Sequence, residues 1–161
     1  MRVAIGLGSN LGDRAAHLVG AVRGLAALGE VLSRSSLWET DPVGGPPQGP
    51  YLNAVVVMHT VLGPRPLLGG CLEIEREAGR ERRERWGPRV LDLDLLLYAD
   101  AVIDVPGLRI PHPRMVERRF VLAPLAEAWP GVEIPGLGSV EDLLADVSDQ
   151  KARRWAGSAD W

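Results

Sequence analysis

Strand-like and helix-like patterns alternate along the first hundred residues of the chain, and their order restricts the folds open to it. Apolar runs that are typical of strands occupy residues 3–8, 31–40, 53–60 and 90–98. Apolar residues recur at helical spacing in residues 15–25 and 67–78. This order, β-α-β-β-α-β, predicts a ferredoxin-like α+β sandwich, in which helices pack against a mainly antiparallel sheet.

The C-terminal third contains shorter patterns. Residues 117–129 have a helical pattern that Pro124 is expected to interrupt. Ser139 is typical of the residue that caps a helix, and it precedes a short helical pattern over residues 140–147. The polar tail from Ser148 onward matches no element.

Composition limits the class of protein. The hydrophobic fraction of 46% and the charged fraction of 24% are ordinary for a soluble protein, and 161 residues suit one domain spanning residues 1–161. The net charge of -3 gives no general attraction to nucleic acid or to an anionic membrane. Cys71 is the only cysteine, which excludes an internal disulfide. No segment resembles a signal peptide or has the length of a membrane span, so we expect a cytoplasmic enzyme.

Lysine is almost absent from the chain. Lys151 is the only lysine, and it lies in the polar tail. A P-loop needs a lysine that reaches the phosphates of a nucleotide, so that mechanism is not expected here. If the protein binds phosphates, arginine and a metal ion must take the place of lysine.

Two carboxylates interrupt the apolar run of residues 90–98. Asp92 and Asp94 are two residues apart, so on a strand they face the same side, about 7 Å apart along the backbone. Like charges on a largely apolar strand repel each other and lose hydration. Mg²⁺ prefers such oxygen ligands, together with the phosphates of a substrate, and it would cancel the repulsion. The alternative is a pair of aspartates that face water or bind nearby arginines.

Arginines gather just before the two aspartates. Guanidinium groups bind phosphate oxygens in pairs of hydrogen bonds, although interleaved glutamates also fit a solvated surface with ion pairs. The neighbouring carboxylates favour the phosphate-binding interpretation. The arginines are Arg76, Arg80, Arg82, Arg83, Arg85 and Arg89.

Three other features are ambiguous by themselves. His112 lies between two prolines, where a stiff backbone can hold it against a ligand or leave it solvated. Tyr51 and Phe120 are among the few aromatic residues, and they can serve as core residues or stack on a flat ring. The stretch GLGSNLG lacks the spacing of a dinucleotide fingerprint, so we interpret it as a tight turn between a strand and a helix.

Several motifs together resemble one family. The stretch RWGPRVLDLDLL, residues 85–96, resembles the signature of the 6-hydroxymethyl-7,8-dihydropterin pyrophosphokinases of folate biosynthesis. Further matching stretches, in the same order along the chain, are GLGSNLGD, ETDPVG, PYLNAVV, IEREAGR and IPHPRMVERRFVLAPL. The resemblance extends over nearly the whole chain, which implies a single pyrophosphokinase domain over residues 1–161.

The resemblance implies the reaction and its cofactors. Such an enzyme moves the β,γ-pyrophosphoryl group of ATP to the hydroxymethyl group of the dihydropterin and releases AMP. Two Mg²⁺ ions would lie between Asp92, Asp94 and the triphosphate. ATP and the pterin would be its partners, with no nucleic acid and no membrane, and a monomer is expected, with a weak dimer as the alternative.

The resemblance also implies a set of site residues. The expected catalytic residues are Arg80, Arg82, Arg89, Asp92 and Asp94, and Arg83 is an alternative to its neighbour Arg82. The expected ATP-binding residues are Glu75, Arg89, Leu95, Arg109, His112 and Arg118. The expected pterin-binding residues are Thr40, Val43, Tyr51, Asn53, Trp86 and Phe120.

Three other functions use some of the same features. A nucleic-acid-binding module is typical of this fold class, but it would need a basic charge and more exposed aromatic residues. A Mg²⁺-dependent phosphohydrolase would need only the metal pair. A catalytically inactive relative would bind ligands without turnover, which the presence of Arg89, Asp92 and Asp94 disfavours.

Overall fold

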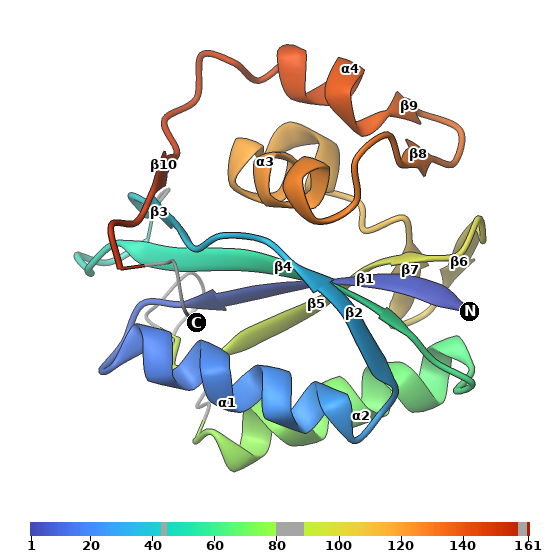
Figure 1. The fold of residues 1–161 in the computed structure, drawn as a ribbon, viewed down its shortest axis with the longest axis horizontal. Coiled ribbons are helices and arrows are strands. Elements are labelled where there is room, and N and C mark those ends of the chain that lie inside the picture. Colours follow the sequence, from blue (N-terminus) through green and yellow to red (C-terminus); the bar gives the residue numbers. More distant parts are fainter. Residues whose placement is uncertain (43–44, 80–88, 158–160) are drawn as a thin grey trace.

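The computed structural model of the chain describes residues 1–42, 45–79, 89–157 and 161. The described residues form a central antiparallel sheet between two helical layers (Figure 1). The strands of this sheet are β1 (Arg2–Ser9), β2 (Glu30–Arg34), β3 (Trp38–Thr40), β4 (Tyr51–His59), β5 (Asp92–Tyr98) and β10 (Arg153–Arg154). The helices are α1 (Arg14–Ala26), α2 (Pro64–Glu77), the 3-10 turn η1 (Met115–Glu117), α3 (Arg119–Ala128) and α4 (Val140–Ala145). The described residues also form two small hairpins: β6 (Ile103–Val105) with β7 (Leu108–Ile110), and β8 (Glu133–Ile134) with β9 (Gly138–Ser139).

The strand order confirms the predicted ferredoxin-like arrangement. β1 lies between β4 and β5, and β4 carries β2 and β3 along its other edge, all in antiparallel pairs. The first helix connects β1 to β2, and the second connects β4 to β5, as the order of patterns required.

The predicted strand over residues 31–40 is two strands instead of one. The break falls at Ser35, whose hydroxyl accepts a hydrogen bond from the Val55 backbone N–H at 2.9 Å. The Ser35 backbone N–H donates to the Val55 carbonyl, also at 2.9 Å. Because a side chain takes over one position of the hydrogen-bond ladder, the edge divides into β2 and β3.

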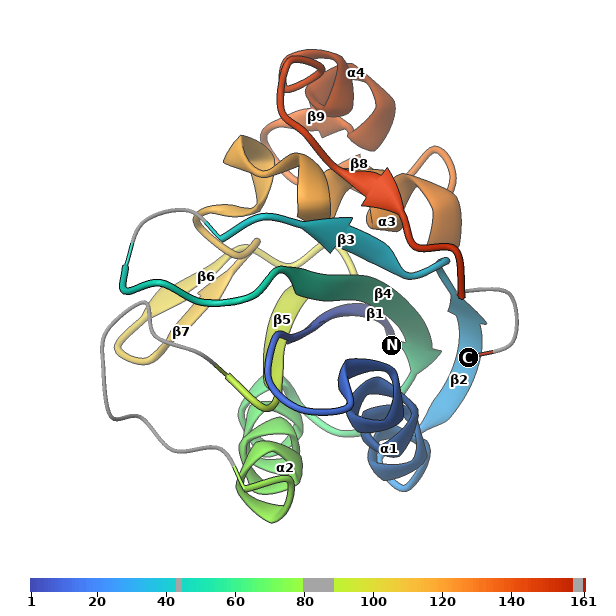
Figure 2. The same cartoon turned by 90° about the vertical axis from the view of Figure 1, so that its left-hand side faces the viewer.

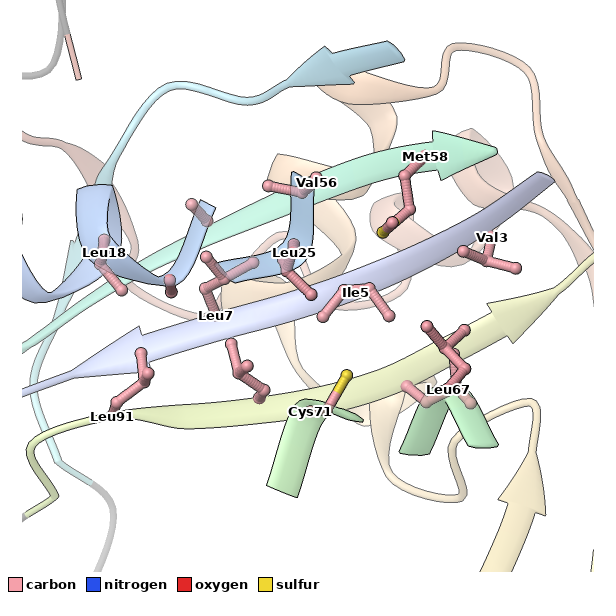
Figure 3. Close-up of a cluster of buried hydrophobic side chains, with 14 of the residues drawn as sticks. Val3, Ile5, Leu7, Leu18, Leu25, Val56, Met58, Leu67, Cys71 and Leu91 are labelled. Carbon is pink, nitrogen blue, oxygen red and sulfur yellow. The ribbon is translucent and has the colours of Figure 1, made fainter. Parts of the chain in front are cut away.

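Each face of the sheet has its own hydrophobic core. On the lower side of the sheet in Figure 1, α1 places Leu18 and Leu25 against β1 and β4, and α2 places Leu67 against β5 (Figure 3). Above it, α3 and its neighbours place residues such as Leu122 and Leu125 against the opposite face. Strands that are covered on both faces are apolar on both sides, which explains the nearly continuous apolar runs in β4 and β5.

The helix α3 continues through Pro124, so the predicted interruption is wrong. Proline removes the backbone donor that would bond four residues back, but the buried side of α3 packs on the sheet and keeps the helix in place. The expected cap of α4 is confirmed, because the Asp142 backbone N–H donates to the Ser139 hydroxyl at 3.2 Å.

The tail beyond Ser148, which the sequence patterns left unassigned, crosses back to the sheet. Its strand β10 pairs with β3 at the edge of the sheet (Figure 2). The Trp155 backbone N–H donates to the Leu37 carbonyl at 2.9 Å, and its ring packs on the core beside α1 and α2.

None of the helices in the described part of the chain combines the length and apolarity that crossing a membrane requires.

Candidate active site

A cleft of about 1300 Å³ opens on the face of the sheet that carries α3. Its floor comes from β1, β4 and β5, and its walls come from residues 45–51, the segment around η1 and α3, and the tail. Eight of the predicted site residues line it together: Thr40, Tyr51, Asn53, Arg89, Asp92, Asp94, Arg118 and Phe120. The fold therefore gathers residues that are up to eighty positions apart in the sequence.

The two aspartates occupy the cleft side of β5. Leu93 and Leu95 are buried in the core beside α2, whereas Asp92 and Asp94 face the cleft. The side chain of Asp94 is 49% exposed, so its charge keeps contact with solvent. The alternation is that of a regular strand, as the sequence predicted.

Two glycines, which have no side chain, lie next to the aspartates in the sheet. On β1, Gly6 pairs with Asp94 and Gly8 pairs with Asp92, and both glycines line the cleft. A Cβ at Gly8 would lie 3.4 Å from Asn53 Oδ1, toward the cleft. The sequence predicted both glycines within the first strand, over residues 3–8, but not their place in the cleft. Two glycines spaced i and i+2 within a strand were the available signal, because they leave one face without side chains.

Polar and aromatic groups form the other half of the cleft. Asn53 is buried on β4, and its side-chain N–H donates to the Thr40 hydroxyl at 2.8 Å. Tyr51 starts the same strand, and Phe120 lies in the first turn of α3. This combination of an oriented amide, a hydroxyl and two rings suits a flat ligand with hydrogen-bonding edges. The predicted residues Val43 and Trp86 lie outside the described residues.

Two of the predicted arginines line the cleft, together with Arg114, and supply it with positive charge. Nη1 of Arg89 is buried and has no hydrogen-bond partner among the described residues. The guanidinium of Arg118 lies 5.5 Å from the centre of the Phe120 ring. Burial lowers the pKa of Arg118, yet arginine keeps its charge at neutral pH. Partly desolvated guanidinium groups of this kind favour an anionic ligand such as a triphosphate.

His112 adjoins the aspartate side of the cleft. Its Nε2 lies 3.9 Å from Asp94 Oδ1, and its backbone N–H donates to the Leu96 carbonyl at 3.0 Å. Burial lowers the pKa of His112; the charge of Asp94 opposes this shift, and those of Arg118 and Arg114 add to it. The imidazole is therefore mainly neutral near pH 7, and it can donate or accept a hydrogen bond.

Three other predicted ATP-binding residues lie away from the cleft lining. Glu75 is buried on α2, where its carboxylate accepts a hydrogen bond from the Leu93 backbone N–H at 3.4 Å. Leu95 belongs to the core below the sheet. Arg109 is exposed on β7 and forms an ion pair with Asp104 at 3.1 Å. The predicted catalytic residues Arg80 and Arg82, with the alternative Arg83, lie outside the described residues.

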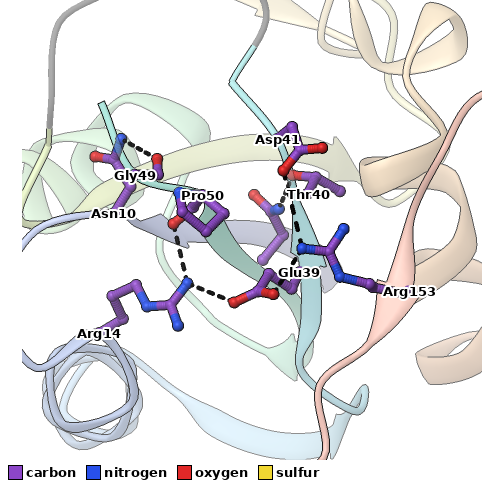
Figure 4. Close-up of polar contacts among 9 residues, drawn as sticks. Asn10, Arg14, Glu39, Thr40, Asp41, Gly49, Pro50 and Arg153 are labelled. Carbon is purple, nitrogen blue, oxygen red and sulfur yellow. Dashed lines mark hydrogen bonds and ion pairs between the residues drawn. The ribbon is translucent and has the colours of Figure 1, made fainter. Parts of the chain in front are cut away.

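Asn10, which no sequence pattern marked as a site residue, joins three segments beside the cleft. Its Oδ1 accepts a hydrogen bond from the Arg89 backbone N–H at 2.7 Å, and its own backbone N–H donates to the Arg89 carbonyl at 3.0 Å. Its Nδ2 donates to Gln48 Oε1 at 2.8 Å. The same Nδ2 donates to the Gly49 carbonyl at 3.1 Å (Figure 4). Asn10 thereby fixes the segment that carries Arg89 against the wall formed by residues 45–51.

A set of ion pairs fixes the strand next to Thr40. Glu39 on β3 accepts hydrogen bonds from Arg14 at 2.9 Å and from Arg153 at 2.7 Å (Figure 4). Arg14 also donates to the Pro50 carbonyl at 3.0 Å. Burial tends to raise the pKa of Glu39, but the two arginines outweigh that effect and hold the pKa below its ordinary value. The first turn of α1, β3 and β10 are thus connected at one end of the cleft.

Comparisons with known proteins agree on one family. A family model described as 7,8-dihydro-6-hydroxymethylpterin-pyrophosphokinase matches residues 4–130. Proteins named 2-amino-4-hydroxy-6-hydroxymethyldihydropteridine pyrophosphokinase are similar along nearly the whole chain. The protein from Methylorubrum extorquens is 45% identical over 95% of this chain and 98% of its own length. The protein from Bacillus subtilis is 50% identical over 94% of this chain and 88% of its own length.

Solved structures share the fold. A crystal structure of HPPK-DHPS from Plasmodium falciparum, with pterin and p-hydroxybenzoate, matches with a TM-score of 0.73 and 16% identity. The match covers 92% of this chain but only 44% of that one, so this chain spans less than half of the larger protein. At this identity the likeness supports the fold alone.

Proposed function

Since this chain belongs to the 7,8-dihydro-6-hydroxymethylpterin-pyrophosphokinase family, we propose that it transfers the β,γ-pyrophosphoryl group of ATP to the hydroxymethyl group of 6-hydroxymethyl-7,8-dihydropterin, in folate biosynthesis. The hydroxyl oxygen attacks the β-phosphorus and forms a new P–O bond. The bond from the β-phosphorus to the oxygen shared with the α-phosphate breaks, AMP leaves, and the hydroxyl proton passes to solvent. One domain over residues 1–161 carries the whole reaction.

The observation that supports this reaction best is the division of the cleft into two chemically different halves. One half presents Asp92, Asp94 and Arg118, and the other presents Tyr51 and Asn53. One half can bind phosphates, and the adjacent half can bind a flat polar ring. Such a cleft suits two substrates that react with each other. Holding both substrates in one cleft removes much of the entropic barrier to a reaction between two molecules.

In the pterin half, we assign Tyr51 and Phe120 to contact the faces of the ring. Asn53 and Thr40 are already joined by a hydrogen bond, so their remaining donors and acceptors are oriented before the ligand binds. Asn53 is buried, so a ligand that leaves its amide unpaired would pay a desolvation penalty. This arrangement selects a ring with complementary donors and acceptors, such as a pterin.

In the phosphate half, the residues of the chain neutralise and orient the triphosphate. Arg89 and Arg118 provide guanidinium groups for the phosphate oxygens. The backbone at Gly6 and Gly8 leaves room for close approach next to the two carboxylates. His112, near Asp94, supplies a mainly neutral imidazole that can bond to ATP. Glu75, Leu95 and Arg109 remain proposed ATP contacts. Their side chains lie outside the cleft lining, so the structure gives them less support than it gives Arg89 and Arg118.

The donor set fits Mg²⁺. Asp92 and Asp94 offer hard oxygen ligands from one side of a strand, beside open space for phosphate oxygens. In the described part of the chain, no group of three or more histidine, cysteine, aspartate and glutamate side chains could hold a metal by itself. Two Mg²⁺ ions held by Asp92, Asp94 and ATP would neutralise the charge of the triphosphate and lower the pKa of the attacking hydroxyl.

Product analysis tests the proposed reaction. The protein is mixed with ATP, Mg²⁺ and 6-hydroxymethyl-7,8-dihydropterin, and AMP, ADP, phosphate and pterin diphosphate are quantified. We expect one AMP for each pterin diphosphate, and no turnover when Mg²⁺ is removed with a chelator. ADP as the nucleotide product would contradict pyrophosphoryl transfer, and phosphate released without pterin would indicate a hydrolase.

A further inference from the structure

The first turn of α3 carries two residues of the cleft but has no cap of its own. Arg118 occupies the N-cap position, and its side chain makes no capping hydrogen bond. The first backbone N–H groups of a helix have no partners within the helix and need them from elsewhere. At α3 the tail supplies a partner, because the Arg119 backbone N–H donates to Gln150 Oε1 at 3.0 Å.

The same glutamine also binds the residue before Arg118. Gln150 Nε2 donates to the Glu117 carbonyl at 2.7 Å. One side-chain amide thus pairs with the backbone on both sides of Arg118, in the way that an adjacent strand would. Arg119 Nη1 strengthens the junction by donating to the carbonyls of Ser148 at 3.1 Å and Gln150 at 2.8 Å.

Gln150 is itself held between two anchored points of the tail. Val147, three residues earlier, is buried in the core beneath α3 and α4. Three residues later, Arg153 begins β10 and pairs with Glu39 of β3. Because the tail is fixed at both ends, the amide of Gln150 meets the start of α3 at a defined place.

We propose that Gln150 is a positioning residue for the reaction. By fixing the backbone from Glu117 to Arg119, its amide sets where the Arg118 guanidinium and the Phe120 ring lie in the cleft. All three side chains line that cleft, and Arg118 lies 5.5 Å from the centre of the Phe120 ring. The inference rests on the proposed function, because Phe120 is assigned to the pterin and Arg118 to ATP. Through Gln150, the tail from Ser148 onward, which none of the sequence motifs covers, would have a role in the site.

Gln150→Met tests the role, because methionine keeps the length and volume of the side chain but makes neither hydrogen bond. We measure the Kd of 6-hydroxymethyl-7,8-dihydropterin by calorimetry, in the presence of Mg²⁺ and α,β-methylene-ATP, which lacks the bond that the reaction breaks. The loss of two hydrogen bonds is expected to weaken pterin binding about tenfold. Asp149→Asn, at an exposed neighbouring position, is the matched control and should bind like the wild type.

A double-mutant cycle separates positioning from general stabilisation. If Gln150 acts through the ring, Gln150→Met should change the pterin Kd less than twofold when Phe120→Ala is already present. Equal losses in both backgrounds, or wild-type binding by Gln150→Met despite a lower melting temperature, would show that Gln150 only stabilises the fold. A folded wild-type protein that binds no pterin would instead overturn the proposed function, together with the premise of this inference.

Discussion

Asp92 and Asp94 are charged residues on a strand whose other side chains are mostly buried. The cleft makes this arrangement possible, since about half of the Asp94 side chain, 49%, stays exposed. The same strand directs Leu93 and Leu95 into the core. The position of each carboxylate is therefore set by the packing of its apolar neighbours, which is a rigid support for a metal site.

Asp94→Ala is expected to abolish turnover and leave the fold intact. The side chain is half exposed and contributes no core contact, so its loss should change the melting temperature little, whereas one of two carboxylates proposed to hold Mg²⁺ disappears. Product formation and the circular dichroism melting curve are the measurements. Asp100→Ala, in the exposed turn after β5, is the control and should keep activity. An active Asp94→Ala enzyme would contradict the assignment.

Gly8→Ala is expected to weaken pterin binding about tenfold or more without destabilising the protein. The added methyl group would lie 3.4 Å from Asn53 Oδ1 and 3.7 Å from the Tyr51 ring, which are ordinary contacts, but it would occupy the floor of the cleft. Alanine is also less costly than glycine within a strand. Calorimetric titration with pterin and thermal melting measure the two effects. Gly20→Ala on α1 has open space around its new Cβ and should bind pterin normally.

At the scale of elements, α3 forms part of one wall of the cleft, and it is attached to the sheet by polar contacts as well as by its core. Glu127, near its C-terminal end, accepts hydrogen bonds at 2.6 Å from the backbone N–H and from the hydroxyl of Ser36. Trp38 Nε1 donates to the same carboxylate at 3.3 Å. With Gln150 at the other end of α3, the helix is held at both of its termini.

The Glu127 contacts predict a dependence of stability on pH. Burial tends to raise the pKa of Glu127, but the hydrogen bonds from Ser36 and Trp38 outweigh it and lower the pKa below its ordinary value of 4.5. A lowered pKa means that the stabilisation is present above that ordinary value and is lost as the pH falls through the folded-state pKa. We expect Glu127→Gln to reduce this acid sensitivity by about 1 kcal/mol, a small value because the carboxylate is partly exposed.

Urea unfolding between pH 6 and about pH 3 measures this effect. The free energy of unfolding of the wild type should fall more steeply with acid than that of Glu127→Gln. Glu133→Gln, on the exposed side of β8, is the control and should follow the wild type. Parallel curves for Glu127→Gln and the wild type would refute a role of this carboxylate in acid sensitivity.

At the scale of the whole molecule, one sheet is shared by two cores. Leu25 belongs to the core below the sheet and Leu122 to the core above it, and both are fully buried. The strands between them contribute side chains to both cores, so both helical layers pack against the same sheet. The floor of the cleft is formed by strands of this shared sheet, so packing in both cores holds the floor in place.

Leu25→Ala and Leu122→Ala should therefore each lower the free energy of unfolding by about 2–5 kcal/mol, in one cooperative transition. Urea unfolding followed by both tryptophan fluorescence and far-ultraviolet circular dichroism measures this. Leu137→Ala, at an exposed position, is the control and should cost much less. Two separate transitions in either core variant would mean that the layers unfold independently.

The elements themselves were largely predictable, because the patterns that encode them are local. The helices α1 and α2, the strands β1, β4 and β5, and the cap of α4 all follow from spacing within a few residues. The prediction failed where a distant segment decided the local structure. Ser35 divides the edge strand by bonding to Val55, and packing on the sheet carries α3 through Pro124.

The sequence alone determined the order of the elements, the family resemblance and the placement of Asp92 and Asp94 on one side of a strand, because strand periodicity depends only on neighbouring residues. Tertiary structure decided which surfaces meet. Gly8 lies beside Asp92 through the register of β1 and β5, Asn10 reaches Arg89 across 79 positions, and Gln150 reaches Arg119 across 31. No local pattern specifies such partners, since strand register and the path of the tail follow from packing the whole chain on one sheet.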